Sequence, residues 1–260
     1  DNKNINEYVN VAINNMNSIV LDYSFIPTFT LSKLTSEYSK AVLSGDGADE
    51  LFGGYEWYRA MKYYNLLPKS VKNFLFQLIN GLSFKNESNG YLTFYHKVNL
   101  FFKYLTDDPY VQMLIWQSPY SQFKDSDINE LKKEINNYIN KKETLSHNLR
   151  NVDLNNYLYT NILPKVDIAS MANSLEVRPP FLDERIVQFA ISNKDTNNVS
   201  FKNSKLYLRN QLEKTKLNYL NNYEKHGFGF PLVSWFKSYG LEEVKQMYTD
   251  NNLVYLERDQ

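Results

Sequence analysis

The sequence predicts an α/β domain in which one short strand is followed by a large, mostly helical region. Residues 40–43 form a short apolar run, and the turn that follows contains two glycines and opens a helix. From Pro68 onward, apolar residues recur at helical spacing through most of the chain. With 260 residues, the chain is long enough to bury roughly 75% of its unfolded surface, so a substantial core is expected.

Two helices are expected before the strand. Apolar positions recur at helical spacing over residues 5–16, and a second helical run follows Pro27. The strand is the only convincing one, and the turn 44–47 joins it to a helix that begins near Asp49.

The remainder is expected to be helical. Pro68 marks the first turn of one helix, and Asp127 and Glu130 have the spacing of a capping box at the start of another. Further helices are expected at residues 91–105, 153–163, 165–175, 183–192, 202–213 and 231–239. Three prolines are expected to end helices: Pro164, Pro179 and Pro180. Aromatic residues at helical spacing are expected in the core, as with Tyr91, Phe94, Tyr95, Phe101 and Phe102.

Composition excludes several classes of function. Lys and Arg together number 29, as do Asp and Glu, so no net charge directs the protein to nucleic acid or anionic lipid. The absence of cysteine excludes disulfides, a thiolate nucleophile and a cysteine metal site in this segment. No apolar stretch approaches the roughly 20 residues of a membrane span. We therefore expect a soluble, cytoplasmic protein that binds neither nucleic acid nor membrane.

The turn after the strand has the features of an anion or nucleotide site. Gly45 and Gly47 let the backbone approach a ligand closely, and Asp46 and Asp49 offer hard oxygen ligands for Mg²⁺ or a substrate amine. The alternative is a structural turn, in which Asp46 caps the helix while Asp49 and Glu50 favour its dipole. Because neither the phosphate-loop pattern nor the dinucleotide fingerprint is present, the residues alone leave both interpretations open.

Segments distributed along the chain resemble, in order, the asparagine synthetase family. Residues 42–55 are similar to the family stretch that follows its fifth sheet strand, and residues 22–28 to the loop lining its aspartate site. Residues 163–183 resemble the longest conserved block of the family's helical region. Residues 205–209 and 225–231 resemble its late helix and its lysine-bearing active-site loop.

This resemblance implies an adenine-nucleotide α-hydrolase-like (ATP pyrophosphatase) synthetase domain. Residues 1–60 would be the end of its α/β nucleotide-binding core, with the last sheet strand or strands, and residues 61–260 its helical region. The family's first ATP-binding loop, Ser-Gly-Gly-x-Asp-Ser, and its glutaminase domain are expected upstream of this chain. No glycine pair replaces that loop, since Gly53-Gly54 belongs to the helix after the turn. The isolated chain is therefore expected to be inactive and to bind ATP weakly.

The resemblance also implies a reaction and its cofactors. In this family ATP activates the side-chain carboxylate of aspartate as an acyl adenylate, and ammonia from glutamine then displaces AMP to give asparagine. By this resemblance, Ser44, Gly45 and Gly47 would contact ATP, and Asp49 would bind Mg²⁺. A homodimer is the expected assembly, if there is one.

Two residues are implied to be catalytic. Asp46 would act in forming the intermediate, at a position where bacterial relatives often carry the longer Glu. Lys225 would neutralise charge developing on the phosphates and on the tetrahedral intermediate, from a glycine-rich loop able to close. Outside that context, Lys225 would be interpreted as an ordinary solvated lysine.

The aspartate pocket has three candidates, each with a structural alternative. Asp22 and Ser24 either line the pocket or cap the following helix. Asp167 either reaches the substrate amine or pairs with Lys165.

Other polar residues favour structural interpretations. Glu176 and Arg178 are expected to form a buried ion pair that holds a helix against Pro179-Pro180. The three histidines, His96, His147 and His226, have no metal-ligand spacing, and only His226 is expected near the site, next to Lys225.

Two other functions remain open. One is an amide-forming relative that acts on another carboxylate, such as a sugar acid in surface polysaccharide synthesis or a β-lactam-type ring closure. Residues 17–21 depart from the acidic, proline-containing family pattern, which leaves room for a different acceptor. The other is an inactive interaction module that keeps the fold.

Overall fold

The computed structural model describes residues 11, 22, 24–80, 98, 101–102, 105–118, 123–192 and 199–223. The helices expected over residues 5–16 and 231–239, and most of the one expected at 91–105, lie outside these described residues.

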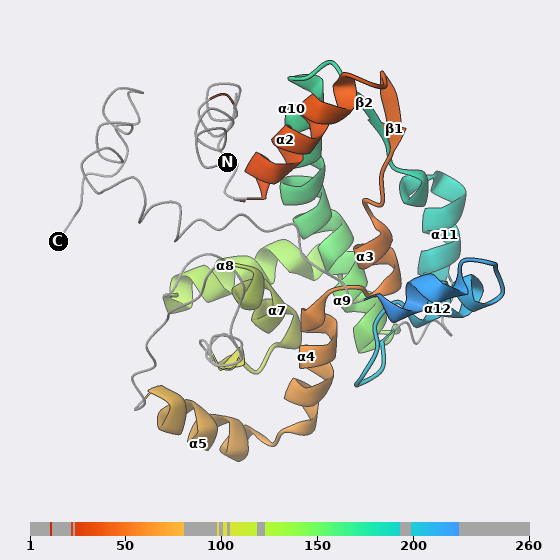
Figure 1. Cartoon of the computed structure of the whole chain (residues 1–260). Helices are drawn as coiled ribbons and strands as arrows, with labels where there is room; N and C mark the ends of the chain where they lie inside the picture. The colour runs from red at the N-terminus through yellow and green to blue at the C-terminus, as the bar shows by residue number, and fades with distance from the viewer. Residues whose placement is uncertain are drawn as a thin grey trace, which may run out of the picture.

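Two short parallel strands form the sheet of the described chain. Helix α2 (Phe25–Ser36) leads into β1 (Ala41–Leu43), which pairs with β2 (Glu176–Arg178) so that Val42 lies opposite Val177 (Figure 1). The predicted first strand is confirmed, but β2 was not predicted. Its three residues are too few to show a strand pattern, and its partner lies far away in the sequence. The mostly helical architecture with a small parallel sheet agrees with the α/β prediction.

Glycines define both ends of the short helix that follows β1. Gly47 is the N-cap of α3 (Ala48–Phe52) with φ 85°, and Gly53 is its C-cap with φ 64°. Both values lie in the left-handed region, which favours glycine. Gly53-Gly54 therefore ends α3 rather than lying within a helix, and it separates α3 from α4 (Glu56–Leu66).

A continuous helical segment crosses the middle of the described chain (Figure 1). It consists of α9 (Leu145–Asp153), the π-helix η2 (Leu154–Ile162) and α10 (Leu163–Met171). The prediction that Pro164 ends a helix is wrong. Pro164 lies in the first turn of α10, where the bonding pattern changes from π to α and a missing N–H is tolerated.

The remaining helices agree in type with the prediction, with some shifted boundaries. They are α5 (Lys69–Asn80), α7 (Pro109–Gln117), α8 (Asp125–Ile135), α11 (Glu184–Ser192) and α12 (Leu206–Glu213), with short 3₁₀ turns η1 (Asn136–Tyr138), η3 (Pro180–Leu182) and η4 (Asn218–Asn222). Helix α8 begins before the predicted capping box. Asp127 is its third residue, and the Asp127 carboxylate accepts from the Lys124 N–H at 2.8 Å.

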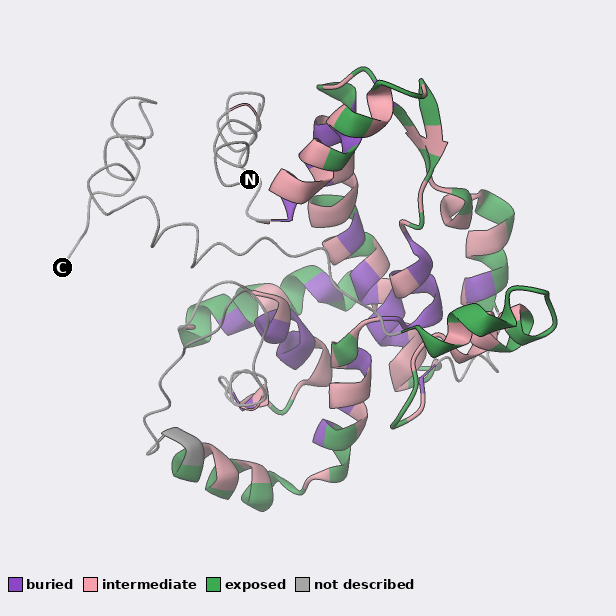
Figure 2. Ribbon diagram, viewed as in Figure 1, coloured by how far each residue is buried: buried purple, intermediate pink, exposed green. Residues whose placement is uncertain are grey.

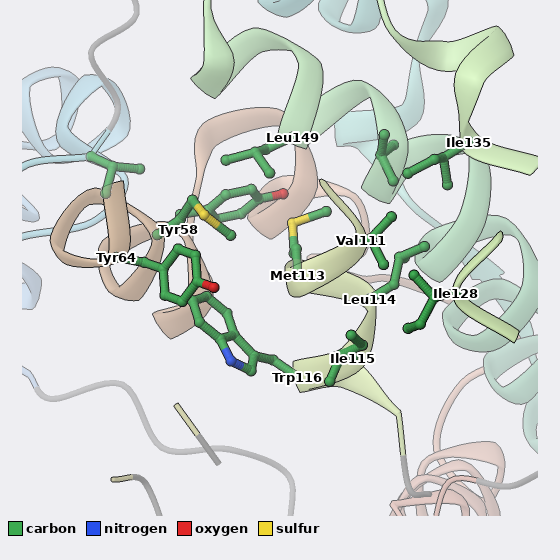
Figure 3. Packing of buried hydrophobic residues seen from close by; sticks show 13 residues of the cluster. Tyr58, Tyr64, Val111, Met113, Leu114, Ile115, Trp116, Ile128, Ile135 and Leu149 are labelled. Carbon is green, nitrogen blue, oxygen red and sulfur yellow. The ribbon is translucent and has the colours of Figure 1, made fainter. Parts of the chain in front are cut away.

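Three apolar clusters hold these elements together, and Figure 2 shows that burial is concentrated around α3, α4, α7 and α9. The largest joins α4, α7, α8 and α9 through residues such as Tyr58, Met113 and Leu149 (Figure 3). A second joins α2 to α10 through Phe25, Phe29 and Ala169, and a third joins α3 to α11 through Leu51, Phe52 and Ala190. Among the predicted core aromatics, Phe102 is buried and Phe101 packs against the largest cluster, whereas Tyr91, Phe94 and Tyr95 lie outside the described residues.

None of the helices in the described ranges combines the length and the apolar character that a membrane crossing requires.

Candidate functional site

The loop between β1 and α3 lies beside the chain that leaves β2. The Ser44 N–H donates to the Arg178 carbonyl at 3.0 Å, which extends the pairing of the strands by one bond. A Cβ at Gly47 would lie 2.2 Å from the Leu182 side chain. The two segments that follow the parallel strands are thus packed against each other at the carboxyl end of the sheet.

Asp46 is held within this loop and does not cap α3. The Ser44 hydroxyl donates to the Asp46 carboxylate at 2.8 Å, while the N-cap of α3 is Gly47, without a side-chain bond. The capping interpretation of Asp46 is therefore wrong. Gly45 is exposed, and a Cβ there would meet no atom within 4 Å, so the backbone at this position is open to a ligand.

Asp49 projects from α3 toward the start of α12. Its Oδ1 lies 3.1 Å from the Lys205 ammonium, with side-chain exposures of 23% for Asp49 and 27% for Lys205. Gly54 lies directly beneath this pair. A Cβ at Gly54 would be 1.7 Å from Asp49 Oδ1 and 2.3 Å from Lys205 Cε, so no residue with a side chain fits there without moving the ion pair.

The neighbouring carboxylate of Glu50 points into the core instead. Glu50 is 1% exposed and accepts a hydrogen bond from the Tyr55 hydroxyl at 2.6 Å. Burial raises the pKa of Glu50 to about 7. Successive helical residues point about 100° apart, since a turn takes roughly 3.6 residues, and this separates Asp49 from Glu50. Glu50 does lie in the first turn of α3, as the helix-dipole interpretation requires, but its carboxylate is buried.

A second buried carboxylate, Asp153, ties α4, α7 and α9 together below the loop. It accepts from Trp57 Nε1 at 2.9 Å, from the Tyr58 hydroxyl at 2.5 Å and from Gln117 Nε2 at 2.6 Å. Burial raises its pKa to about 6, against the opposing effect of these donors. Asp153 was not predicted as a site residue, because an acidic residue in a helical pattern is usually exposed.

Arg150, also from α9, fixes the end of α3. Its guanidinium donates to the carbonyls of Leu51 at 2.6 Å and Ala190 at 3.2 Å, and it is nearly fully buried. Burial lowers the pKa of Arg150. This contact links α3 to α11 and so holds the segment that carries Asp49.

A separate polar cluster joins the start of α2 to α10. The Lys165 ammonium lies 2.7 Å from Asp22 Oδ2 and donates to the Ser24 hydroxyl at 2.8 Å, and the Ser24 N–H donates to Asp22 Oδ1 at 2.9 Å. Lys165 is 7% exposed. Burial acts to raise the pKa of Asp22, but the charge of Lys165 and the hydrogen bonds from Lys165 and Ser24 hold it below its ordinary value.

This cluster decides between several earlier alternatives. The Ser24 side chain does not cap α2, so the capping interpretation is wrong for Ser24. Asp22 does organise the start of α2, because its carbonyl accepts from the Phe25 N–H at 2.9 Å. Lys165 pairs with Asp22 and Ser24, which contradicts the suggested pairing with Asp167. Asp167 is exposed on α10.

Tyr157 of η2 lies close both to the buried carboxylates of Glu50 and Asp153 and to the polar cluster of Asp22 and Lys165. Its ring meets those of Tyr55 and Trp57 edge to face, with centroids 5.6 and 5.4 Å apart. Burial raises the pKa of Tyr157, and the charges of Asp22, Asp153 and Glu50 raise it further. The charges near the β1–α3 loop and the charge of Asp22 therefore act on one side chain.

The ion pair between Glu176 and Arg178 is present, but it is not buried. Arg178 Nε lies 2.7 Å from Glu176 Oε1, with side-chain exposures of 64% and 58%. Both residues belong to β2 and are two positions apart, so they point to the same, outward face of the strand. The predicted pair is confirmed and its predicted burial is wrong.

The catalytic lysine implied by the resemblance, Lys225, lies outside the described residues, as do His226 and His96. The third histidine, His147, belongs to α9. Within the described ranges, no three His, Cys, Asp or Glu side chains gather into a metal-binding group. Asp49, the Mg²⁺ ligand that the resemblance implies, therefore belongs to no such group in the described ranges. One carboxylate fits Mg²⁺ that is bound mainly through substrate phosphates, since Mg²⁺ commonly takes only one or two carboxylates in such sites.

Comparison with known proteins gives a consistent set of relatives. The family model for asparagine synthase matches residues 1–258. Asparagine synthetase [glutamine-hydrolyzing] 1 of Bacillus subtilis is 28% identical over 253 residues, which cover 92% of this chain and 38% of the relative. A putative asparagine synthetase [glutamine-hydrolyzing] of Mycobacterium tuberculosis is 27% identical over 227 residues, which cover 84% of this chain and 34% of the relative.

A putative asparagine synthetase [glutamine-hydrolyzing] 2 of Methanocaldococcus jannaschii gives a shorter match. It is 40% identical over 78 residues, which cover 28% of this chain and 14% of the relative. The chain thus spans 34% to 38% of the length of the Bacillus and Mycobacterium relatives. No solved structure gives a significant match.

Proposed function

The chain belongs to the asparagine synthase family, and on that premise we propose that it forms part of the synthetase site of a glutamine-dependent asparagine synthetase. The proposed fold is the adenine-nucleotide α-hydrolase-like fold, with residues 1–60 at the end of its nucleotide-binding core and residues 61–260 in its helical region. The proposed reaction belongs to the whole protein. ATP and Mg²⁺ are its cofactors, and aspartate and glutamine-derived ammonia are its other substrates.

The observation that carries the proposal is the arrangement at the carboxyl ends of β1 and β2. In α/β sheets, ligands bind outside the carboxyl ends of parallel strands. Here the loop 44–47 and the segment 179–182 leave that edge side by side, with Gly47 against Leu182 and Gly45 open. This arrangement supports a nucleotide site in which Ser44, Gly45 and Gly47 contact ATP.

The proposed reaction has two steps. First, an oxygen of the aspartate side-chain carboxylate attacks the α-phosphorus of ATP, and pyrophosphate leaves. Ammonia then attacks the acyl carbon of the resulting β-aspartyl-AMP, AMP leaves with the bonding electrons, and a proton is lost from nitrogen. Asp46, whose carboxylate accepts from Ser44, is proposed to assist formation of the intermediate. Lys225 is proposed to balance the negative charge that develops in both steps.

Asp49 is the residue that we propose holds Mg²⁺. Mg²⁺, when bound, would neutralise negative charge on the phosphate oxygens of ATP as pyrophosphate leaves the α-phosphorus. The carboxylate is fixed for this role by Gly54 beneath it and by α3, which Arg150 anchors through the Leu51 carbonyl.

The group at the start of α2 is proposed to form one wall of the aspartate pocket. Asp22 and Lys165 neutralise each other at 2.7 Å, and Ser24 is held by Lys165. This leaves Asp167, which is exposed on α10, as the proposed partner of the substrate amine.

The test is release of pyrophosphate by the whole protein with a panel of carboxylic acids, with and without glutamine. Aspartate is expected to give the fastest release, and glutamine is expected to convert the adenylate to asparagine. A faster reaction with a sugar acid or another carboxylate would redirect the proposal to an amide-forming relative. If no carboxylic acid gave release of pyrophosphate, the proposed synthetase activity would be wrong, although the chain would still belong to the family.

A further inference from the structure

Two residues from separate parts of the chain form an ion pair at the candidate metal ligand. Asp49 belongs to α3, while Lys205 is the N-cap residue of α12, and these two helices are in contact (Figure 1). Lys205 Nζ lies 3.1 Å from Asp49 Oδ1, one of the oxygens that a divalent cation would bind. An ammonium and a metal ion cannot occupy the same position on this oxygen.

Lys205 has an unusual backbone conformation. Lys205 has φ 53°, in the left-handed region that residues with a Cβ seldom adopt. Such a conformation is strained and persists only where the surroundings hold it. Arg209 binds the backbone on both sides of this turn: its N–H donates to the Lys205 carbonyl at 2.9 Å, as the first helical bond of α12, and its Nε–H donates to the Ser204 carbonyl at 3.1 Å.

Packing beneath the pair leaves little freedom to separate it. Lys205 Cε would lie 2.3 Å from a Cβ at Gly54, so the lysine stem passes directly over the glycine. Both charged groups are about three-quarters buried, which strengthens their attraction compared with a surface pair. The surrounding packing therefore holds Lys205 against Asp49, unlike a solvent-exposed ion pair.

We infer that Lys205 is the resident counter-ion of Asp49, and that a divalent cation reaches Oδ1 of this carboxylate only by displacing Lys205. This inference rests on the proposed role of Asp49 as a metal ligand. Its consequence is that the free protein binds a bare cation poorly. A cation that arrives with anionic ligands of its own is favoured, because it depends less on Asp49.

The first experiment measures Mn²⁺ affinity without nucleotide, by titration followed with electron paramagnetic resonance. Lys205→Met removes the competing charge and keeps the stem, and it is expected to raise Mn²⁺ affinity about fivefold, the upper range for an ion pair of this exposure. Lys202→Met is the matched control, because Lys202 is an exposed lysine of the same segment, and it is expected to leave the affinity unchanged. Asp49→Asn is expected to lose this binding.

The outcomes separate this inference from the proposed function. Equal Mn²⁺ affinity of the wild-type protein and Asp49→Asn would overturn Asp49 as a metal ligand. Loss of binding in Asp49→Asn, together with unchanged or weaker binding in Lys205→Met, would overturn the inference alone and leave Asp49 as a ligand.

A second measurement uses the unmodified protein and does not depend on the folding of a Lys205 variant. The rate of reductive methylation of each lysine is followed by mass spectrometry of peptides, without Mg²⁺ and with Mg²⁺ at a concentration that saturates the site, which competition with Mn²⁺ in the first experiment determines. Methylation of Lys205 is expected to be slow without metal and several-fold faster with it, while Lys202 is unaffected. In Asp49→Asn, Lys205 is expected to be modified rapidly under both conditions. A rate for Lys205 that does not respond to Mg²⁺ in the wild-type protein would overturn the inference.

Discussion

Lys165 and Asp22 form a largely buried ion pair that ties α10 to the start of α2, with 2.7 Å between Nζ and Oδ2. Removal of one partner leaves the other charge without compensation. Lys165→Met is therefore expected to lower the free energy of unfolding by about 3 kcal/mol. Urea unfolding measures this change.

The control for that substitution is Lys69→Met. Lys69 pairs with Asp107 at 2.5 Å, but the two side chains are 68% and 69% exposed. Its loss is expected to cost less than about 1 kcal/mol, since water screens the pair. Equal losses in the two variants would contradict the stabilising role assigned to the buried pair.

Glu50 is expected to make stability fall as the pH rises. Its ordinary pKa is 4.5 and burial raises it to about 7 in the folded state. Between these values the unfolded chain has lost its proton while the folded chain keeps it, so the unfolded state gains free energy of ionisation. The stabilising contribution of Glu50 is therefore fully present below pH 4.5 and lost above about pH 7. The free energy of unfolding falls by up to about 3 kcal/mol across this interval.

The measurement is the free energy of unfolding across pH 4 to 8 for the wild-type protein and Glu50→Gln. The amide keeps an acceptor for Tyr55, so the variant is expected to show a flatter profile over this interval. Glu56→Gln is the control, because Glu56 is largely exposed on α4. A profile for Glu50→Gln as steep as that of the wild type would assign the dependence to another group, such as Asp153.

The two glycines of the β1–α3 loop are expected to respond differently to alanine. Gly47→Ala must adopt φ 85° and meets Leu182, so it is expected to cost about 2 kcal/mol of stability. Gly45→Ala meets no atom within 4 Å and is expected to change stability by less than about 0.5 kcal/mol. If the backbone at Gly45 approaches ATP, the same substitution in the whole protein weakens ATP binding. Calorimetry and unfolding together separate these effects, and unchanged ATP binding would count against a nucleotide contact at Gly45.

Lys225→Ala is expected to abolish aspartate-dependent release of pyrophosphate in the whole protein, while hydrolysis of glutamine remains measurable. The reason is that the developing negative charge loses its counter-charge. Lys214→Ala, at an exposed lysine after α12, is expected to leave both activities intact. Loss of both activities in Lys225→Ala would indicate misfolding.

Local signals were enough to predict β1, the turn after it and the helices α5 and α11. Each has a short-range cause, such as the glycines at Gly45 and Gly47 or Pro68 before α5. Strand β2 could not be predicted, because a three-residue strand is determined by its partner Val42 rather than by its own pattern. The interpretation of Asp46 as a cap failed because Gly47, in the left-handed region, is the N-cap itself.

The sequence indicated candidate acidic and polar site residues, but it did not indicate which lysines pair with them. Asp22, Ser24 and Asp49, which were predicted as substrate or metal residues, lie in polar groups of the structure, and their roles in binding stay predictions. Their cations, Lys165 and Lys205, come from distant parts of the sequence, and no local pattern indicates which acid each lysine meets.

The π-helix η2 determines how far the side chains of α10 are rotated about the helix axis relative to those of α9. Asp153 lies at the end of α9 and Lys165 in the first turn of α10, so η2 separates them. A π-helix turns less per residue than an α-helix, because its hydrogen bonds span five residues instead of four. Conversion of η2 to α-helix would therefore rotate Lys165 away from Asp22 while Asp153 kept its donors. An insertion or deletion within residues 154–162 would uncouple the two polar groups even if every side chain in them were retained.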